Sequence, residues 1–482
     1  MSRHRLPTLL PLAVALAAAG CSLAPAPTPP PVTAPQLWRA EAGAPAPGAA
    51  VPADWWRAFA DPALDALVAE ALAANRDLAR AVARVDEARA LARVARADRL
   101  PGVDLEASAA RGRTSEAIGV VPPGADPVGE RGRVAASLAF ELDLFGRVRN
   151  QAEAARQDLL AAGYARDAVR LAVASEVATA YFDLLALDRQ VAVTEKTIES
   201  RRRGHELIEL RYRGGLASRL DFERSRAERA GAEATLPELQ SLQRARENGL
   251  AILLGRMPGA VERGAGLETI GGPEIPAGLP SELLLRRPDV AAAEAGLAAA
   301  AARIGSARAA LFPSIVLTGA YGRESTNLSN LFVSPATIWQ AAAGLLAPIF
   351  DGGRNRALVA AARARQQQAV IGYLQTAEGA FREVEDALFA IGARRRRVAA
   401  LAEQTEALTS AAELARLRYQ EGEAGYLEVL DAERFRLAAE LALAAGRRDA
   451  LAAGVDLFRA LGGGWSAAPA AGVGPAPAAK TN

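Results

Sequence analysis

The chain has 482 residues, with 57 lysines and arginines, 55 aspartates and glutamates and 2 histidines, for a formal net charge of +2. Residues 1–20 hold two of the arginines and no acid, so the chain without them carries 55 charges of each sign. Interspersed charges that cancel give no electrostatic basis for binding nucleic acid. The single cysteine excludes an intrachain disulfide.

The N-terminus has the pattern of a secretory signal peptide. Arg3 and Arg5 precede an apolar stretch at 9–19, which is too short to span a membrane as a mature helix. The stretch ends in Ala18-Ala-Gly-Cys21, which resembles a bacterial lipobox. We therefore predict a lipoprotein signal peptide over 1–20 and an acylated Cys21, rather than a buried structural thiol. No cofactor is expected apart from this lipid.

Pro- and Ala-rich segments flank the main body. Residues 21–53 combine the acylated cysteine with a composition that cannot bury a core, which predicts an extended tether. Residues 464–482 are rich in Pro, Ala and Gly and are predicted to be disordered. After the signal peptide, no apolar run reaches the length of about 18 residues that predicts a transmembrane helix.

The first half of the body predicts helices around a β-hairpin. Asp61-Pro62 supplies an N-cap with proline at the first helical position. Two alternating apolar–polar runs around a Gly- and Pro-containing loop predict the hairpin. A proline-free stretch follows that would span about 100 Å as a helix. The predicted elements are a helix over 61–99, strands over 103–109 and 134–142, and helices over 143–211 and 218–254.

The second half repeats the first about 207 residues further along, a period too long for a solenoid. The corresponding segments are Leu100-Pro101 with Phe312-Pro313, Phe145–Asn150 with Phe350–Asn355, and Leu210–Gly215 with Leu417–Gly422. The second set of predicted elements is a helix over 289–311, strands over 315–323 and 338–350, and helices over 353–419 and 425–461. The repeat predicts two copies of one architecture, over 54–255 and 288–463, joined by an irregular or mixed mid-height segment over 256–287.

The strands and the long helices predict an oligomer that enters a membrane. The long helices carry a dilute, coiled-coil-like apolar pattern suited to helix–helix packing. Each strand has an uncharged face of about the 9–11 residues that cross a bilayer in a β-barrel. Four strands cannot close a barrel, for which about eight is the minimum, so several copies must complete one. Two soluble surface hairpins remain the alternative, because 315–323 and 338–350 alternate less cleanly.

Three segments together carry a resemblance: Asp54–Leu64 (DWWRAFADPAL), Phe140–Gly146 (FELDLFG) and Gly278–Val290 (GLPSELLLRRPDV). With an Arg-Tyr pair before each glycine turn, they resemble the TolC-type outer membrane efflux proteins, in particular the NodT-like lipoproteins. The resemblance extends from about Trp55 to Gly463. It implies a mostly α fold with a small β part, in which a homotrimer forms one 12-stranded outer-membrane barrel and a helical periplasmic tunnel.

The resemblance also implies a function. Such proteins are passive exit ducts of tripartite pumps in the outer membrane of Gram-negative bacteria, anchored there by lipid in this branch. They receive small molecules from an inner-membrane pump of the RND type through a periplasmic adaptor, the membrane fusion protein. The alternative is a lipid-anchored periplasmic coiled-coil protein, structural or adaptor-like, without a pore.

Two acids point to a gate. Glu428 and Asp431 are spaced i and i+3 after the second glycine turn, so they share a helix face. The resemblance implies that acids at these positions line the periplasmic aperture, where a trimer would present a ring of carboxylates that favours cations. The alternative is that Glu428 is an acid favoured by the helix dipole and Asp431 a solvated residue.

The tip turns are the other candidate positions. Tyr212, Gly214 and Gly215 form the first turn, and Tyr419 and Gly422 form the second. The resemblance places latch residues of a closed aperture here, and assigns Tyr419 to the aperture itself. Ala424 occupies a position where some relatives carry arginine, so no ionic latch of that kind is expected.

Enzyme chemistry is not indicated. The sequence has no HExxH, Walker A or dinucleotide-binding motif, and no metal site is predicted. His205, the one histidine beyond the signal peptide, is predicted to have a surface or packing role. The arginine run 394–397 is interpreted as a solvated helix face rather than a ligand site.

Overall fold

The computed structural model describes residues 23–26, 28–35, 38–39, 51–115, 117, 124, 126–264, 266–275 and 280–465. The predicted signal peptide, Cys21, much of the tether and nearly all of the C-terminal tail lie outside the described residues. Within the described part, no helix combines the length and apolar character needed to cross a membrane.

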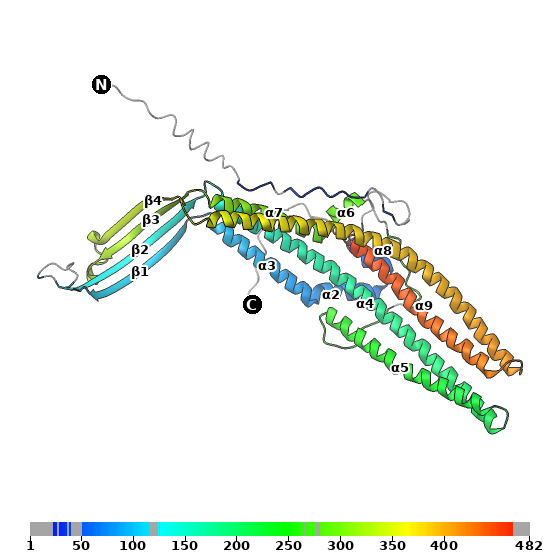
Figure 1. The fold of residues 1–482 in the computed structure, drawn as a ribbon. Helices are drawn as coiled ribbons and strands as arrows, with labels where there is room; N and C mark the ends of the chain where they lie inside the picture. Colours follow the sequence, from blue (N-terminus) through cyan, green and yellow to red (C-terminus); the bar gives the residue numbers. More distant parts are fainter. Residues whose placement is uncertain are drawn as a thin grey trace. The chain divides into compact units, whose positions relative to one another are not determined.

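The described chain is mostly helical with one small sheet, which confirms the predicted fold class (Figure 1). The main elements are η1 (Trp55–Phe59), α2 (Pro62–Ala74), α3 (Arg76–Ala97), β1 (Gly102–Arg113), β2 (Val128–Leu142), α4 (Arg147–Arg213), α5 (Arg219–Leu253), α6 (Pro280–Arg286), α7 (Pro288–Ala309), β3 (Ser314–Ser325), β4 (Thr337–Leu346), α8 (Arg354–Gln420) and α9 (Tyr426–Ala460), with short 3₁₀ turns η3 (Leu328–Asn330) and η4 (Ser334–Ala336). The two halves repeat the same order of elements.

These elements form two compact units. One unit holds the four strands together with parts of α3, α4, α7 and α8, over residues 85–162 and 293–373 and a short N-terminal portion. The other holds η1, α2, α5, α6, α9 and the remainder of α3, α4, α7 and α8, over residues 31–84, 163–292 and 374–482.

In the first unit the strands form one antiparallel sheet in the order β1-β2-β3-β4. The register places Leu138 opposite Val103 and Gly319, and Phe140 opposite Leu317. Directly opposed side chains share a face of an antiparallel sheet. Over most of the sheet, one face is therefore uncharged and largely apolar, and its members are Val103, Leu105, Ala107, Ala109, Val134, Ala136, Leu138, Phe140, Leu142, Ile315, Leu317, Gly319, Tyr321, Trp339, Ala341, Ala343 and Leu345. We call this set the apolar sheet face. Beyond this band the same side of the sheet carries Arg111, Arg113, Glu130 and, opposite Val134, Arg323.

The sequence predicted too few helix breaks. A single helix was expected over 61–99, but the structure divides it into α2 and α3 at Asn75. The Asn75 N–H donates to Ala71 O at 2.8 Å, which ends α2, and its side-chain oxygen accepts from the Asp77 and Leu78 N–H groups at 2.9 and 3.0 Å. One residue thus caps both helices, and its carboxamide also donates to Leu253 O at 2.8 Å.

Other boundaries differ because caps were not recognised. The long helix expected from 143 begins at Arg147, because the Asp143 carboxylate accepts from the Val148 and Arg149 N–H groups at 3.2 and 2.6 Å. Strand β4 ends at Leu346 rather than at 350. The predicted caps at Asp61 and Ser218 are confirmed, with Ala63 N–H and Asp221 N–H as donors at 2.9 and 3.1 Å.

The core of the second unit uses the segments that carried the resemblance. Trp55 stacks on Phe458 with ring centroids 5.1 Å apart, and Phe59 packs against Phe182 at 5.0 Å. The nearly buried Arg287 donates to Glu383 at 2.8 Å and to Ala460 O at 3.0 Å, and pairs with Asp289. These residues therefore join η1, the start of α7, and helices α8 and α9 by packing and buried charge.

Candidate functional site

The candidate site lies in the second unit, at the turns that close two helical hairpins, α4–α5 and α8–α9 (Figure 1). Gly215 and Gly422 adopt φ of 72° and 80°, a left-handed conformation that glycine reaches without strain. In each turn the following residue closes the same hydrogen bond, Leu216 N–H to Arg211 O at 2.7 Å and Glu423 N–H to Arg418 O at 2.8 Å. The repeat seen in the sequence is thus a repeat of turn geometry.

Aromatic side chains hold the α4–α5 hairpin together behind its turn. Tyr212 stacks on Phe222 with centroids 5.2 Å apart and an interplanar angle of 17°. His205 lies next along α4, with its ring 5.4 Å from Phe222 and Nδ1 2.8 Å from Ser225 Oγ. Because His205 is only 6% exposed and has this partner, its role is packing, the second of the two roles that the sequence left open.

A second aromatic pair holds the α8–α9 hairpin. Tyr419 and Tyr426 lie 5.3 Å apart. Burial, with the nearby Glu433 carboxylate, raises the pKa of Tyr426 to about 12, so the phenol stays neutral at physiological pH. The nearly buried Glu433 forms an ion pair with Arg416, which in turn donates to Ser200 Oγ of α4 at 3.1 Å.

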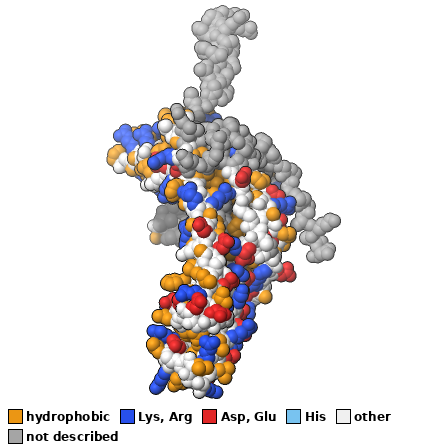
Figure 2. All heavy atoms as spheres, turned by 90° about the vertical axis from the view of Figure 1, so that its right-hand side faces the viewer, with side chains coloured by type: hydrophobic (Ala, Val, Ile, Leu, Met, Phe, Trp, Pro, Cys, Tyr) orange, Lys and Arg blue, Asp and Glu red, His pale blue; other side chains and the backbone are white. Residues whose placement is uncertain are grey.

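The two candidate aperture acids do not stand alone. Glu428 pairs with Arg418 of α8 at 2.6 Å, and Asp431 lies 3.7 Å from Arg434, one turn further along α9. Both acids keep nearly half of their side-chain surface exposed, 44% and 46%. Figure 2 likewise shows charges of both signs interspersed on the face that it displays. An aperture lined by these acids would thus carry their arginine partners as well.

Two further contacts join one hairpin to the other. The Arg211 guanidinium of α4 lies 5.2 Å from the Tyr419 ring centroid of α8. Glu228 of α5 binds Arg201 of α4 at 3.0 Å and also Arg434 of α9, whose pKa is raised by that hydrogen bond. The hairpins of one chain are therefore linked by a cation–π contact near the turns and by an Arg–Glu–Arg bridge further up.

The structure brings most predicted tip residues into this arrangement. Tyr419 contacts Arg211 and Tyr426, Tyr212 contacts Phe222, and the three turn glycines lie where predicted. The sequence analysis noted Arg211 and Arg418 only as members of the Arg-Tyr pairs, and it did not identify them or Arg434 as partners of these groups. The i, i+3 spacing of Asp431 and Arg434 was the one signal that could have revealed a partner. Within the described residues, no group of three or more His, Cys, Asp or Glu side chains could hold a metal ion.

Comparison with known proteins places this geometry in context. The model of the family described as outer membrane efflux protein matches residues 67–256 and 279–463. Outer membrane protein OprJ of Pseudomonas aeruginosa is 40% identical over 430 residues, covering 87% of this chain and 88% of OprJ. Solvent efflux pump outer membrane protein SrpC of Pseudomonas putida is 36% identical over 411 residues, covering 85% and 87%. The open state of the MtrE outer membrane channel of Neisseria gonorrhoeae superposes with a TM-score of 0.82 at 32% identity, covering 92% of this chain and 98% of MtrE.

Proposed function

The chain belongs to the outer membrane efflux protein family, and from this premise we propose that it is the exit duct of a tripartite efflux pump. It is an outer-membrane protein that conducts small molecules passively and is not an enzyme. An inner-membrane transporter of the RND type and a periplasmic adaptor deliver those molecules.

The observation that carries this proposal is the apolar sheet face. Its uncharged band crosses all four strands, and its members on the edge strands β1 and β4 are well exposed in the single chain, with Leu105 and Trp339 each 77% and Leu345 68% exposed. Most of its members on β2 and β3 are half-buried. An outward apolar band with aromatic residues is what a strand presents to lipid in an outer-membrane barrel. A lipid-anchored coiled-coil protein without a pore would have no role for such a face.

We propose that three copies of the chain complete the duct. Within the described sheet, β1 and β4 are the edges, and in lipid an unpaired edge is too costly to persist. Pairing β4 of one copy with β1 of the next closes a ring, and three copies give twelve strands. This count is even and above the minimum of about eight strands for a closed membrane barrel.

The internal repeat predicts the strand register at the seam, which is the pairing of β4 of one copy with β1 of the next. Inside one chain, Phe140 of β2 faces Leu317 of β3. Because Phe145 corresponds to Phe350 and Phe312 to Leu100, the counterpart of Phe140 is Leu345 and that of Leu317 is Leu105. We therefore place Leu345 of one copy opposite Leu105 of the next, with both side chains on the apolar sheet face.

The tip is proposed as the periplasmic aperture. Three copies would gather Glu428, Asp431 and Tyr419 around one axis, with Tyr212, Gly214, Gly215 and Gly422 in the turns. The links from Arg211 to Tyr419 and from Glu228 to Arg434 hold the two hairpins of each copy together. Opening requires these links to loosen, so the contacts between hairpins set the closed state.

Lipidation of Cys21 is proposed as a second attachment to the outer membrane, because the barrel itself already holds the protein there. Mass spectrometry of the mature N-terminus tests this point. A diacylated or triacylated Cys21 is expected. An unmodified N-terminus elsewhere would remove the anchor from the account and leave the duct unaffected.

Single-channel recording tests the duct itself. Purified full-length protein in a planar lipid bilayer should give discrete conductance steps, small while the aperture is closed. The variant Tyr419→Ala should give larger or longer openings from the same preparation. A protein that yields no steps in either form, although it is oligomeric and folded, would favour the coiled-coil alternative.

A further inference from the structure

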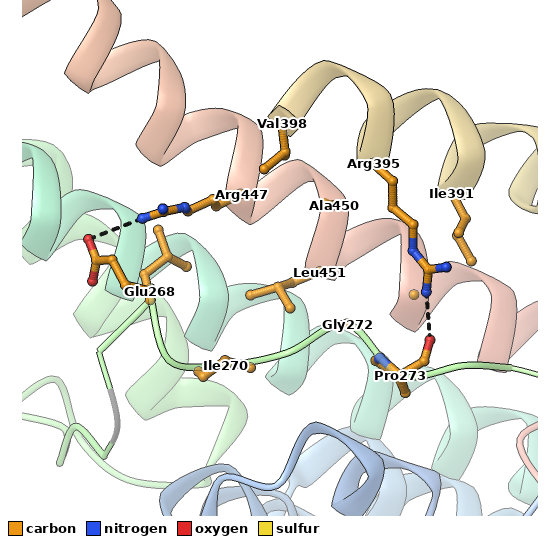
Figure 3. Close-up of a pocket in the computed structure, with 12 residues that line it drawn as sticks. Glu268, Ile270, Gly272, Pro273, Ile391, Arg395, Val398, Arg447, Ala450 and Leu451 are labelled. Atoms are coloured by element: carbon orange, nitrogen blue, oxygen red, sulfur yellow. Dashed lines mark hydrogen bonds and ion pairs between the residues drawn. The ribbon is translucent and has the colours of Figure 1, made fainter. Parts of the chain in front are cut away.

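A pocket of about 260 Å³ lies in the second unit, between the segment that joins the two repeats and helices α8 and α9 (Figure 3). Along α8, its last lining residue Val398 precedes Tyr419 by 21 residues, which is about 30 Å of helix. The pocket is therefore separate from the tip. Its volume is below the roughly 300–1,000 Å³ of pockets for drug-sized ligands, so it suits a molecule of about one ring.

The pocket has an apolar interior and a charged rim. Six aliphatic side chains line it, namely Leu267, Ile270, Ile391, Val398, Ala450 and Leu451. The charged lining consists of Arg395, Arg447 and Glu268. Figure 3 shows Arg447 and Arg395 on opposite sides of Leu451, the first directed to Glu268 and the second to the Pro273 carbonyl.

The two arginines differ in how well their charge is balanced. Arg447 shares Glu268 with Arg189, at 3.6 and 2.9 Å respectively, so one carboxylate serves two guanidinium groups. Arg395 donates to the Pro273 carbonyl at 3.0 Å, and no carboxylate of the described residues forms an ion pair with it. Its neighbours Arg394 and Arg397 both pair with Asp449, at 3.5 and 3.1 Å. The rim therefore has an excess of positive charge, and it is concentrated at Arg395.

We propose that this pocket binds a small amphipathic anion, with a carboxylate or sulfonate on Arg395 and an apolar body over Ile270, Val398 and Leu451. A guanidinium fork matches a carboxylate in geometry and charge, and the neutral carbonyl that it now contacts leaves other N–H donors for the ligand. All four arginines of the run 394–397 are exposed, as the sequence interpretation expected, but their partners differ. Two of its members bind Asp449, one faces the pocket, and Arg396 lies outside the pocket lining.

The test uses the full chain in lipid nanodiscs, which avoids detergent as a competing amphiphile. The probe is 4-(trifluoromethyl)phenylacetate, titrated by ¹⁹F NMR, with its neutral amide as the matched ligand. Saturable binding of the acid is expected with a Kd on the order of 1 mM, typical of a ligand of this size. The amide should bind at least tenfold more weakly.

The matched variants are Arg395→Gln and Arg396→Gln, which remove one charge each from adjacent positions of the same helix. Arg395→Gln should weaken binding of the acid at least tenfold, whereas Arg396→Gln should leave it within twofold. Leu451→Trp fills the interior and should abolish binding without changing the charge. Equal effects of the two arginine variants, equal binding of acid and amide, normal binding to Leu451→Trp, or no saturable binding to the parent would each overturn the proposal.

Discussion

The guanidinium of Arg211 lies 5.2 Å from the centre of the Tyr419 ring, and this contact joins α4 to α8 beside their turns. At an exposed site such a contact contributes about 0.5–1 kcal/mol. If it forms once in each of three copies and is lost on opening, the closed aperture gains about 1.5–3 kcal/mol from it. That energy corresponds to roughly a 10- to 140-fold change in the ratio of open to closed states.

Arg211→Ala should therefore open the aperture more often. The expected result is an open probability increased by roughly tenfold or more in single-channel recordings, with the oligomer intact. Arg213→Ala is the matched control, because among the described residues Arg213 pairs only within its own helix, with Glu209. Equal behaviour of the two variants would mean that the cation–π contact does not hold the tip.

The ion pairs at the tip predict the direction in which ion selectivity changes when one of the partners is removed. Replacing both Glu428 and Asp431 by Ala leaves Arg418 and Arg434 without these acids, so the reversal potential under a salt gradient should shift toward anion preference. Block by multivalent cations should weaken as well. Arg418→Ala should shift the reversal potential in the opposite direction. Unchanged potentials in both variants would place these side chains outside the conduction path.

The apolar sheet face should not tolerate charge. Leu138→Arg or Leu317→Arg should each cost roughly 2–4 kcal/mol if the position is near the bilayer midplane, and the yield of assembled protein should fall. Ser137→Arg, one residue away on the other face, should assemble at close to the parental yield. Heat-modifiable migration on gels reports assembly. If the Leu138 and Leu317 variants assemble normally, these strands do not face lipid.

Protonation of Asp289 at low pH should destabilise the core of the second unit. Burial disfavours its charged form, but the hydrogen bond and charge of Arg287 outweigh burial and lower the pKa of Asp289 below its ordinary 3.8. A lowered carboxyl pKa contributes stability above pH 3.8, and that contribution is lost as the pH falls through the lower folded value.

Near-UV circular dichroism during acid titration can measure this loss. Asp289→Asn should be less stable than the parent at neutral pH, and the difference should shrink below about pH 4. Asp77→Asn is the control, since the one ion pair of Asp77 within the described part of the chain is an exposed i, i+3 pair with Arg80. A stability difference that stays constant down to the lowest pH would contradict the linkage.

Much of the fold could be predicted from local sequence patterns, whereas contacts between residues far apart in the sequence could not. The alternation at 103–109 and 134–142 predicted the apolar sheet face because side-chain direction in a strand has period two. The pairing of β2 with β3 joins strands about 180 residues apart, and no local pattern specifies it. Asn75 went unnoticed because one polar residue inside an amphipathic run looks like part of its polar side.

In the candidate site, too, local features could be predicted from the sequence and long-range contacts could not. The glycine turns and the shared face of Glu428 and Asp431 follow from spacing alone. The partner of Glu428 lies across a turn, and the bridge from Glu228 to Arg434 spans 206 positions. Such pairs depend on how the helices pack, so only the folded chain shows the arginine partner of Glu428, whereas the i, i+3 spacing of Asp431 and Arg434 is visible in the sequence.

The seam between copies offers the most direct test of the central claim, that this sheet continues through other copies of the chain in the membrane. Directly opposed residues of antiparallel strands are close enough for a disulfide. The double variant Leu105→Cys, Leu345→Cys should therefore cross-link in outer-membrane fragments under mild oxidation, giving dimers and trimers on non-reducing gels and nothing larger. A double variant with Glu106→Cys in place of Leu105→Cys puts one thiol on the opposite face and should stay uncrosslinked. Cross-linking that is absent from the first variant, equal in the two, or extended beyond trimers would contradict the account.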